Sequence, residues 1–331
     1  MSGRRIGHLA HVAVLMILTL SAAVLSPRAA CAESGSSSGP ALKWQKLGAS
    51  SGRPLIFLPA VGLPGQYWSK VYDQFQATHP IYVVSFAGSG GVPATTPPYF
   101  EKIVDGLHEL IVGEKLKDPA LIGHFLGLQL ALRTAAKYPD EVGGVFGLPM
   151  ASPRPPMNQR QVASENVTAD YLKSDPELWL PTMSQQIRLV ARNPETVAKL
   201  TELIKGTDRE TYARMMGEMV ADPIEEYLPK VRCPVYLVAT IPPQRRGETI
   251  EDGQERLAAI SQARVDLLRS LYPGLAKCNI TALRNVEFYA MMDSANRLEF
   301  PLDRFLKRLD DPHSRWESTI PGASSAAPAK P

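Results

Sequence analysis

The 331-residue sequence predicts an α/β protein with a mainly parallel β-sheet flanked by helices, and with a helical insertion between two of the strands. Short, largely apolar runs alternate with helical segments from about residue 41, which is the pattern of strands covered by helices on both faces. This alternation implies right-handed crossover connections. It stops between Met150 and Pro229, where the sequence has a helical pattern throughout.

The elements can be assigned in order along the chain. Six apolar runs are expected to form strands, and they cover residues 54–60, 81–88, 120–125, 143–150, 234–240 and 279–285. The clearest helix is 251–271, where apolar residues recur at helical spacing. Residues 151–229 are predicted to form a helical cap over a core made of residues 41–150 and 230–309. The cap methionines, Met183 among them, are expected mainly to fill its interior, although thioethers also suit an adaptable apolar pocket.

The N-terminal stretch has the features of a secretory signal peptide. A basic start with Arg4 and Arg5 precedes a charge-free, mostly apolar run from residue 12 to 25, and small residues frame a cleavage site near Ala32. Residues 1–32 are therefore predicted to be removed on export, which gives a periplasmic or secreted protein; an uncleaved anchor is the alternative. Residues 33–40 are expected to form a flexible linker and residues 310–331 a disordered tail.

The excess of positive charge belongs to this signal. The chain has 36 basic and 33 acidic residues, and Arg4, Arg5 and Arg28 account for the difference. The mature protein is formally neutral, so its charge gives no support for a nucleic-acid partner or for a membrane partner beyond the export signal.

Two cysteines remain after cleavage, Cys233 and Cys278, in a compartment where disulfides persist. Each stands just before a predicted strand. If those strands are parallel neighbours, their starting ends lie about 5 Å apart, which suits a disulfide. Two buried free thiols are the alternative.

The stretch from residue 118 to 140 reads as a short strand, the turn Gly123-His124-Phe125-Leu126-Gly127 and an amphipathic helix. This order resembles the nucleophile elbow of the α/β-hydrolase fold, Gly-X-Ser-X-Gly. The resemblance extends over nearly all of residues 41–309 and is nearest to a group of bacterial, partly exported, α/β hydrolases. It implies an oxyanion-hole loop in "LIFLPAVGLPGQYWSKV" and a histidine-bearing region in "FYAMMDSANRLEFPLDRFL".

The residues that the resemblance would make catalytic are replaced. Phe125 stands at the nucleophile position, and the histidine position falls on Phe288, or on Glu287 if the alignment shifts by one residue. Serine hydrolysis needs an oxygen nucleophile and an imidazole within hydrogen-bond reach, and a phenyl ring supplies neither. The remaining candidates for a base are His124, whose ordinary interpretation is a space-filling residue of the turn, and Glu287, whose pKa an apolar pocket would raise.

A pocket is expected above the turn. The backbone N–H groups of Leu126 and of the loop at Ala60 and Val61 are predicted to point into it, as in an oxyanion hole. Two phenyl rings at its centre either close the cavity or suit an apolar or aromatic ligand. Tyr67 and Trp68 can instead pack against the edge of the sheet. The full predicted lining is Ala60, Val61, Tyr67, Trp68, Phe125, Leu126, Met150, Met183 and Phe288.

The sequence thus favours an exported, non-hydrolytic binding or scaffold protein on a hydrolase fold, with an apolar small molecule or a protein as its partner. The alternative is an active enzyme of the same superfamily, esterase-like or a lyase or oxygenase, that works through His124 or Glu287. No cofactor or metal is expected: the "GSGG" run at 88–91 lacks the lysine and helix of a phosphate-binding loop, and no Cys/His cluster has metal-ligand spacing.

Overall fold

The computed structural model describes residues 40–150, 155–173, 175–243 and 250–319. The predicted signal peptide at 1–32 and all but the last residue of the predicted linker lie outside these ranges. Among the helices of the described ranges, none combines the length and the apolar character that crossing a bilayer requires.

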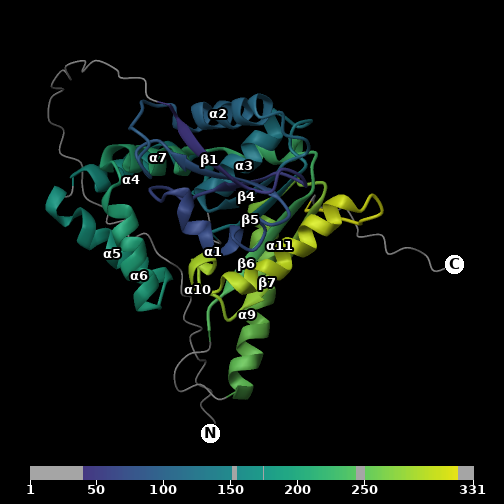
Figure 1. Ribbon diagram of the computed structural model, residues 1–331. Coiled ribbons are helices and arrows are strands. Elements are labelled where there is room, and N and C mark those ends of the chain that lie inside the picture. The colour runs from purple at the N-terminus through teal and green to yellow at the C-terminus, as the bar shows by residue number, and fades with distance from the viewer. Residues whose placement is uncertain (1–39, 151–154, 174, 244–249, 320–331) are drawn as a thin grey trace, which may run out of the picture. The chain divides into compact units, whose positions relative to one another are not determined.

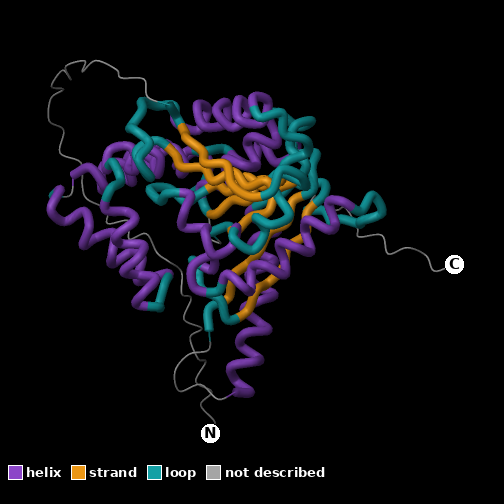
Figure 2. Tube along the Cα trace, in the orientation of Figure 1, coloured by secondary structure: helices purple, strands orange, loops and turns teal. Residues whose placement is uncertain are grey.

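The described residues form a seven-stranded sheet with the order β1-β3-β2-β4-β5-β6-β7. All strands run parallel to their neighbours except β1, which pairs antiparallel with β3. Figure 2 shows the strands of the sheet in orange. The six predicted strands are confirmed with small changes at their ends. The strands are β1 (Leu42–Gly48), β2 (Leu55–Leu58), β3 (Pro80–Phe86), β4 (Ala120–His124), β5 (Gly144–Leu148), β6 (Val235–Ile241) and β7 (Cys278–Arg284).

The sequence gives little sign of β1, which is an edge strand. Most of its side chains are exposed, including Trp44 at 43%, and only Leu42 is fully buried. An antiparallel edge strand needs no continuous apolar run, so periodicity does not reveal it.

Helices cover both faces of the sheet. The main ones are α1 (Ser69–Tyr72), α2 (Tyr99–Gly113), α3 (Leu126–Lys137), α9 (Ile250–Leu271), α10 (Ala290–Asp293) and α11 (Ala295–Asp310). Strand β5 shows the two layers directly: a Cβ added at Gly144 would meet Leu309 of α11, and one at Gly147 would meet Leu128 of α3. Residues three apart on a strand face opposite ways, so α3 and α11 lie on opposite faces, as Figure 1 shows.

A helical insertion separates β5 from β6, as the sequence predicts (Figure 1). It contains α4 (Arg160–Lys173), α5 (Trp179–Val190), α6 (Pro194–Lys205), α7 (Arg209–Ala221) and α8 (Ile224–Tyr227). The carboxylate of Glu218 on α7 accepts the backbone N–H groups of Tyr99 and Phe100, both at 2.9 Å, and so caps α2. The guanidinium of Arg133 on α3 pairs with the buried carboxylate of Asp222. These bonds fix the α7 end of the insertion to the core.

The expected disulfide is not formed. Cys233, two residues before β6, and Cys278, the first residue of the neighbouring parallel strand β7, are both buried free thiols. The register explains this, because Cys278 stands opposite Val235 and not opposite Cys233, so the two cysteines are offset by two residues along the strands. Burial raises the pKa of each thiol to about 12, which makes both inert nucleophiles near neutral pH.

The predicted start of the disordered tail, at residue 310, is wrong. Residues 311–319 are instead tied to the start of β7 and to the segment after α9: the backbone N–H of Cys278 donates to the carbonyl of Glu317 at 2.8 Å, and the N–H of the buried Thr319 donates to the carbonyl of Leu275 at 2.9 Å. Trp316 contacts Phe305, with ring centroids 6.2 Å apart. Composition alone does not reveal these contacts. Residues 320–331 lie outside the described part of the chain.

Candidate functional site

The turn after β4 has the backbone of a nucleophile elbow. Phe125 adopts φ 53° and ψ −109°, a strained conformation for a residue with a Cβ, and its N–H donates to the carbonyl of Leu148 at 3.0 Å. The flanking glycines permit the turn. A Cβ at Gly123 would lie 2.5 Å from the backbone nitrogen of Leu128, and one at Gly127 would lie 2.4 Å from the Leu58 carbonyl oxygen. The chain therefore keeps a strained elbow although its side chain cannot attack a carbonyl.

The structure brings together the two residues at the expected nucleophile and histidine positions. The rings of Phe125 and Phe288 meet edge to face with centroids 6.1 Å apart. Phe288 also lies 4.3 Å from the ring of His124 and 5.1 Å from that of Tyr289. Phe125, Phe288 and Tyr289 are half-buried, so part of each ring remains accessible. Apolar ring surface therefore occupies the two positions where a serine hydrolase has its oxygen nucleophile and its imidazole.

His124 is fully buried beneath these rings. The hydroxyl of Tyr67 lies 2.9 Å from His124 Nδ1, and the same oxygen accepts the backbone N–H of Ala60 at 3.2 Å. A hydroxyl oxygen has two acceptor sites, so either the hydroxyl or Nδ1 can donate in this contact, depending on the tautomer of the imidazole. His124 Nε2 has no hydrogen-bond partner in the described structure. Burial lowers the pKa of His124 to about 3, so the ring is neutral near pH 7 and serves as a packed interior group.

Glu287 lies at the edge of the site. Burial raises the pKa of its carboxyl group, and Asp293 raises it further, while Arg192 opposes the shift. Arg192 Nε lies 3.3 Å from Glu287 Oε1. The hydroxyl of Thr196 on α6 donates to the carboxylate of Asp293. Both contacts join the α5–α6 part of the insertion to the segment that carries Phe288.

Three backbone N–H groups were expected to point into the pocket as in an oxyanion hole. One of them already makes a hydrogen bond, and the other two do not. The N–H of Ala60 is taken by Tyr67, which removes it from the predicted oxyanion hole. Within the described ranges the N–H groups of Val61 and Leu126 make no hydrogen bond. They follow β2 and β4, which are adjacent and parallel, so both lie at the same edge of the sheet.

The other predicted lining residues have different positions. Trp68 is fully buried, and its indole N–H donates to the carbonyl of Leu58 at 3.2 Å, which is a packing role. Tyr67 is 4% exposed and Met183, on α5, is 3% exposed, whereas Met150, just after β5, is half-buried. The accessible part of the predicted lining is therefore small and consists mainly of the two phenyl rings.

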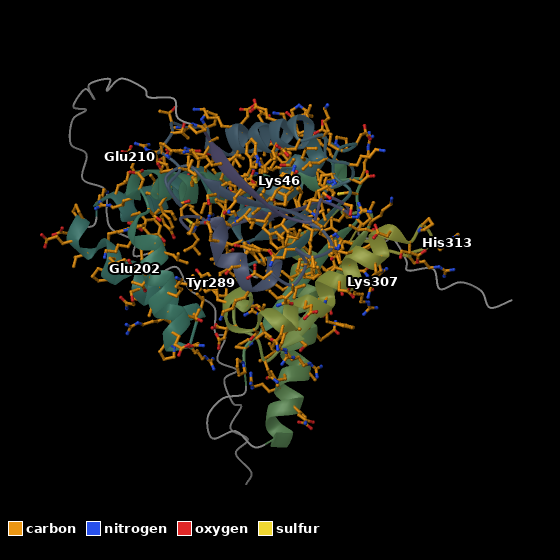
Figure 3. All side chains as sticks on the ribbon, viewed as in Figure 1. Lys46, Glu202, Glu210, Tyr289, Lys307 and His313 are labelled. Carbon is orange, nitrogen blue, oxygen red and sulfur yellow. The ribbon has the colours of Figure 1, made fainter. Side chains whose placement is uncertain are left out.

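Aromatic residues that the sequence analysis did not assign form a cluster within the insertion. Tyr171, Trp179 and Tyr212 come from α4, α5 and α7 and pack edge to face, with centroids between 5.1 and 6.1 Å apart. The ring of Tyr212 lies against Gly62, where an added Cβ would be 2.6 Å from it. Tyr289, labelled in Figure 3, follows Phe288. The sequence feature that could have identified them is the presence of large aromatic residues in an otherwise polar helical stretch.

No group of three or more His, Cys, Asp or Glu side chains that could hold a metal ion occurs among the residues that the structure describes.

Several solved structures share this architecture. A thermophilic esterase from Thermogutta terrifontis has a TM-score of 0.60 at 17% identity, covering 82% of this chain and 94% of the esterase. An enol-lactonase from Burkholderia xenovorans has a TM-score of 0.59 at 15% identity, covering 80% and 96%. A bromoperoxidase from Bacillus anthracis has a TM-score of 0.61 at 13% identity, covering 80% and 95%. No family model and no curated protein sequence matches the chain. The strand order, the elbow and these similarities together show that the chain has the α/β-hydrolase fold.

Proposed function

We propose that this protein does not hydrolyse esters and instead binds an apolar ligand on the accessible ring surface of Phe125, Phe288 and Tyr289. The observation that carries the proposal is the strained elbow with a phenyl ring at its centre, 6.1 Å from a second phenyl ring at the histidine position. Acyl transfer has no oxygen nucleophile there, and the one imidazole nearby is neutral, buried and bonded to a tyrosine.

A fluorophosphonate probe, which labels active serine hydrolases covalently, tests whether the protein lacks hydrolytic activity. We expect no covalent labelling of the wild type and no turnover of nitrophenyl acetate above buffer. In Phe125→Ser the oxygen stands on the elbow without a base, so labelling should stay weak. The double variant Phe125→Ser, Phe288→His places an imidazole near the new hydroxyl and should label measurably. Covalent labelling of the wild-type protein, with the modified residue identified, would contradict the proposal that it does not hydrolyse esters.

The binding half has its own test. Phe125→Asp introduces a carboxylate into the ring surface, where an apolar ligand would have to desolvate it. We expect apolar ligands such as 2-ethylnaphthalene to lose at least about tenfold in affinity, which is a free-energy loss of about 1.4 kcal/mol. The matched control is Phe300→Asp on α11, because Phe300 is 71% exposed and stands outside the site.

An enzymatic alternative rests on Glu287. Its raised pKa and its place next to Phe288 are those of a general base for proton abstraction from a substrate in the site. If screening finds any such activity, Glu287→Gln should abolish it and Arg192→Lys should not. An activity that survives in Glu287→Gln would exclude this role.

We also propose that the chain is exported and cleaved after Ala32. The proposal is supported by the basic start and the apolar run of the N-terminal sequence. Mass spectrometry of the protein isolated from its natural host should give a mature form that begins at Glu33, and a full-length form would count against export.

A further inference from the structure

The α5–α6 hairpin, residues 179–205, makes two polar side-chain contacts with the core within the described ranges (Figure 1). Arg192, in the loop between the two helices, lies with its Nε 3.3 Å from Glu287 Oε1, and the hydroxyl of Thr196 on α6 donates to Asp293. Apart from Thr196, the buried side chains of the hairpin are apolar or aromatic. Near neutral pH, a change in pH can therefore act on the docking of the hairpin through these two acids.

The carboxylates that hold the other half of the insertion have partners, whereas these two acids are incompletely bonded. Glu218 on α7 accepts two backbone N–H groups of α2, and Arg160 on α4 donates to both oxygens of Glu225, at 2.8 and 2.9 Å. By contrast, Glu287 Oε1 and Asp293 Oδ2 are buried and have no hydrogen-bond partner in the part of the chain that the structure describes. Two buried, incompletely bonded carboxylates are unfavourable as long as both are charged.

The surroundings of Glu287 favour its neutral form. Burial raises the pKa of its carboxyl group, the charge of Arg192 opposes this rise, and the charge of Asp293 adds to it. Lys70 of α1 also contacts residues 287–293, but its ammonium donates to the carbonyl of Met292 at 3.0 Å. The repulsion between the two acids and the burial of Glu287 thus outweigh the attraction of Arg192.

The raised pKa of Glu287 links proton binding to the docking of the hairpin. Undocking would hydrate Glu287 and return its pKa towards the ordinary value of 4.5. The docked state therefore binds a proton more tightly than the undocked state does. By linkage, docking is strongest at acidic pH and weakens as the pH rises through the raised pKa of the docked state.

We propose that Glu287 and Asp293 form a proton-dependent latch, which holds the α5–α6 hairpin on residues 287–293 at acidic pH and loosens it at neutral pH. The same segment carries Phe288 and Tyr289, so loosening should expose more of the ring surface. This consequence for ligand access rests on the proposed function. The latch itself requires no ligand.

Hydrogen exchange of the ligand-free protein at pH 5 and pH 8 tests the latch. Mass spectrometry gives protection factors for residues 179–205, each corrected for the intrinsic exchange rate at its pH. We expect about threefold to tenfold greater protection at pH 5 in the wild type. Glu287→Gln carries no charge at either pH, so its protection should be high and equal at both. Effects of His124 on stability are common to the two proteins and cancel in this comparison.

A second variant and a matched control assign the effect. Asp293→Asn keeps an oxygen that can accept from Thr196 and removes the like charge, so the pH effect should shrink without disappearing. This variant decides the test if Glu287→Gln does not fold. Glu202→Gln on α6, labelled in Figure 3, is the control: the Glu202 side chain is 72% exposed, so the full wild-type effect should remain.

Two outcomes would overturn the latch. One is protection of residues 179–205 in the wild type that is equal at both pH values or lower at pH 5. The other is a pH effect that both Glu287→Gln and Asp293→Asn retain in full, since it would then belong to another group. Neither result bears on the affinity for 2-ethylnaphthalene, so the latch and the proposed binding function can fail independently.

Discussion

The elbow turn, residues 123–127, and the post-β7 segment, residues 287–293, supply the two facing phenyl rings but are held by different means. The elbow is fixed by backbone: a positive φ at Phe125, two tightly packed glycines and a bond to β5. The post-β7 segment is fixed by side chains of other elements: Arg192 and Thr196 of the insertion, and Lys70 of α1, whose ammonium donates to the Met292 carbonyl at 3.0 Å. The turn therefore keeps its shape whatever side chain it carries, whereas the segment depends in part on the insertion.

The largest effect is expected at the elbow backbone. In Gly127→Ala the new Cβ would lie 2.4 Å from the Leu58 carbonyl oxygen and 2.6 Å from that of Pro59, and neither backbone atom can move without shifting β2. We expect a loss of about 3 kcal/mol or more in the free energy of unfolding, measured by urea denaturation.

Gly113→Ala is the control, because a Cβ at this position of α2 meets nothing within 4 Å. It should raise the stability by about 0.5–1 kcal/mol. If Gly127→Ala were as mild as this control, the elbow would not be fixed by its backbone.

The fold can be predicted from the sequence because local features fix the backbone of the elbow. Glycines two residues either side of Phe125, a preceding apolar strand and a following amphipathic helix are local features, and each is confirmed. The edge strand β1 and the packed segment 311–319 were missed or misassigned because their stability comes from distant contacts with β3 and β7. Their local composition carries no periodic signal.

The site was predictable only where it lies on the core. The meeting of Phe125 with Phe288 follows from the fold resemblance, since both stand at fixed places in the strand order. The hydrogen bond from the Ala60 N–H to the Tyr67 hydroxyl and the packing of Trp179 against Tyr212 do not follow from it. They depend on how the insertion and one side chain pack, and packing between distant segments is not encoded in spacing.

The contribution of the elbow residue His124 to the free energy of unfolding should depend on pH. The pKa of buried His124 is about 3, below the usual 6.5, so below pH 6.5 the unfolded chain binds a proton that the folded chain does not. This contribution to stability is complete above pH 6.5 and falls as the pH drops towards 3. By pH 5 it should have decreased by about 2 kcal/mol.

Urea denaturation of the wild type and of His124→Asn at pH 7 and pH 5 isolates this contribution. Asparagine does not titrate and retains a group that can bond to Tyr67. The stability gap between the two proteins should therefore narrow by about 2 kcal/mol at pH 5. Equal loss in both would mean that His124 is hydrated and not part of a rigid elbow.

The side-chain ties of the post-β7 segment should have smaller effects. Thr196→Val removes the hydroxyl that donates to Asp293, whose other oxygen is buried and has no partner in the described structure. We expect a loss of about 1–2 kcal/mol, and faster hydrogen exchange at residues 287–293 than at the elbow.

Thr201→Val on the same helix is the matched control. Its hydroxyl bonds only to the Val197 carbonyl one turn away, so its removal should be nearly neutral. Unchanged exchange at residues 287–293 in Thr196→Val would show that the segment holds its shape without the insertion.

The smallest effect is expected at the ion pair of Arg192 with Glu287. Arg192 is 60% exposed, so screening limits the pair to about 0.5 kcal/mol, while the Glu287 carboxylate is only 14% exposed. Arg192→Ala should cost this amount at pH 8 and raise the already elevated pKa of Glu287. Because the pair needs an ionised carboxylate, the cost should disappear as the pH falls through that raised pKa. Arg188→Ala, an exposed site on α5, should show no such dependence. A cost for Arg192→Ala that persisted at pH 3 would mean that the arginine stem, and not its charge, holds the segment against the insertion.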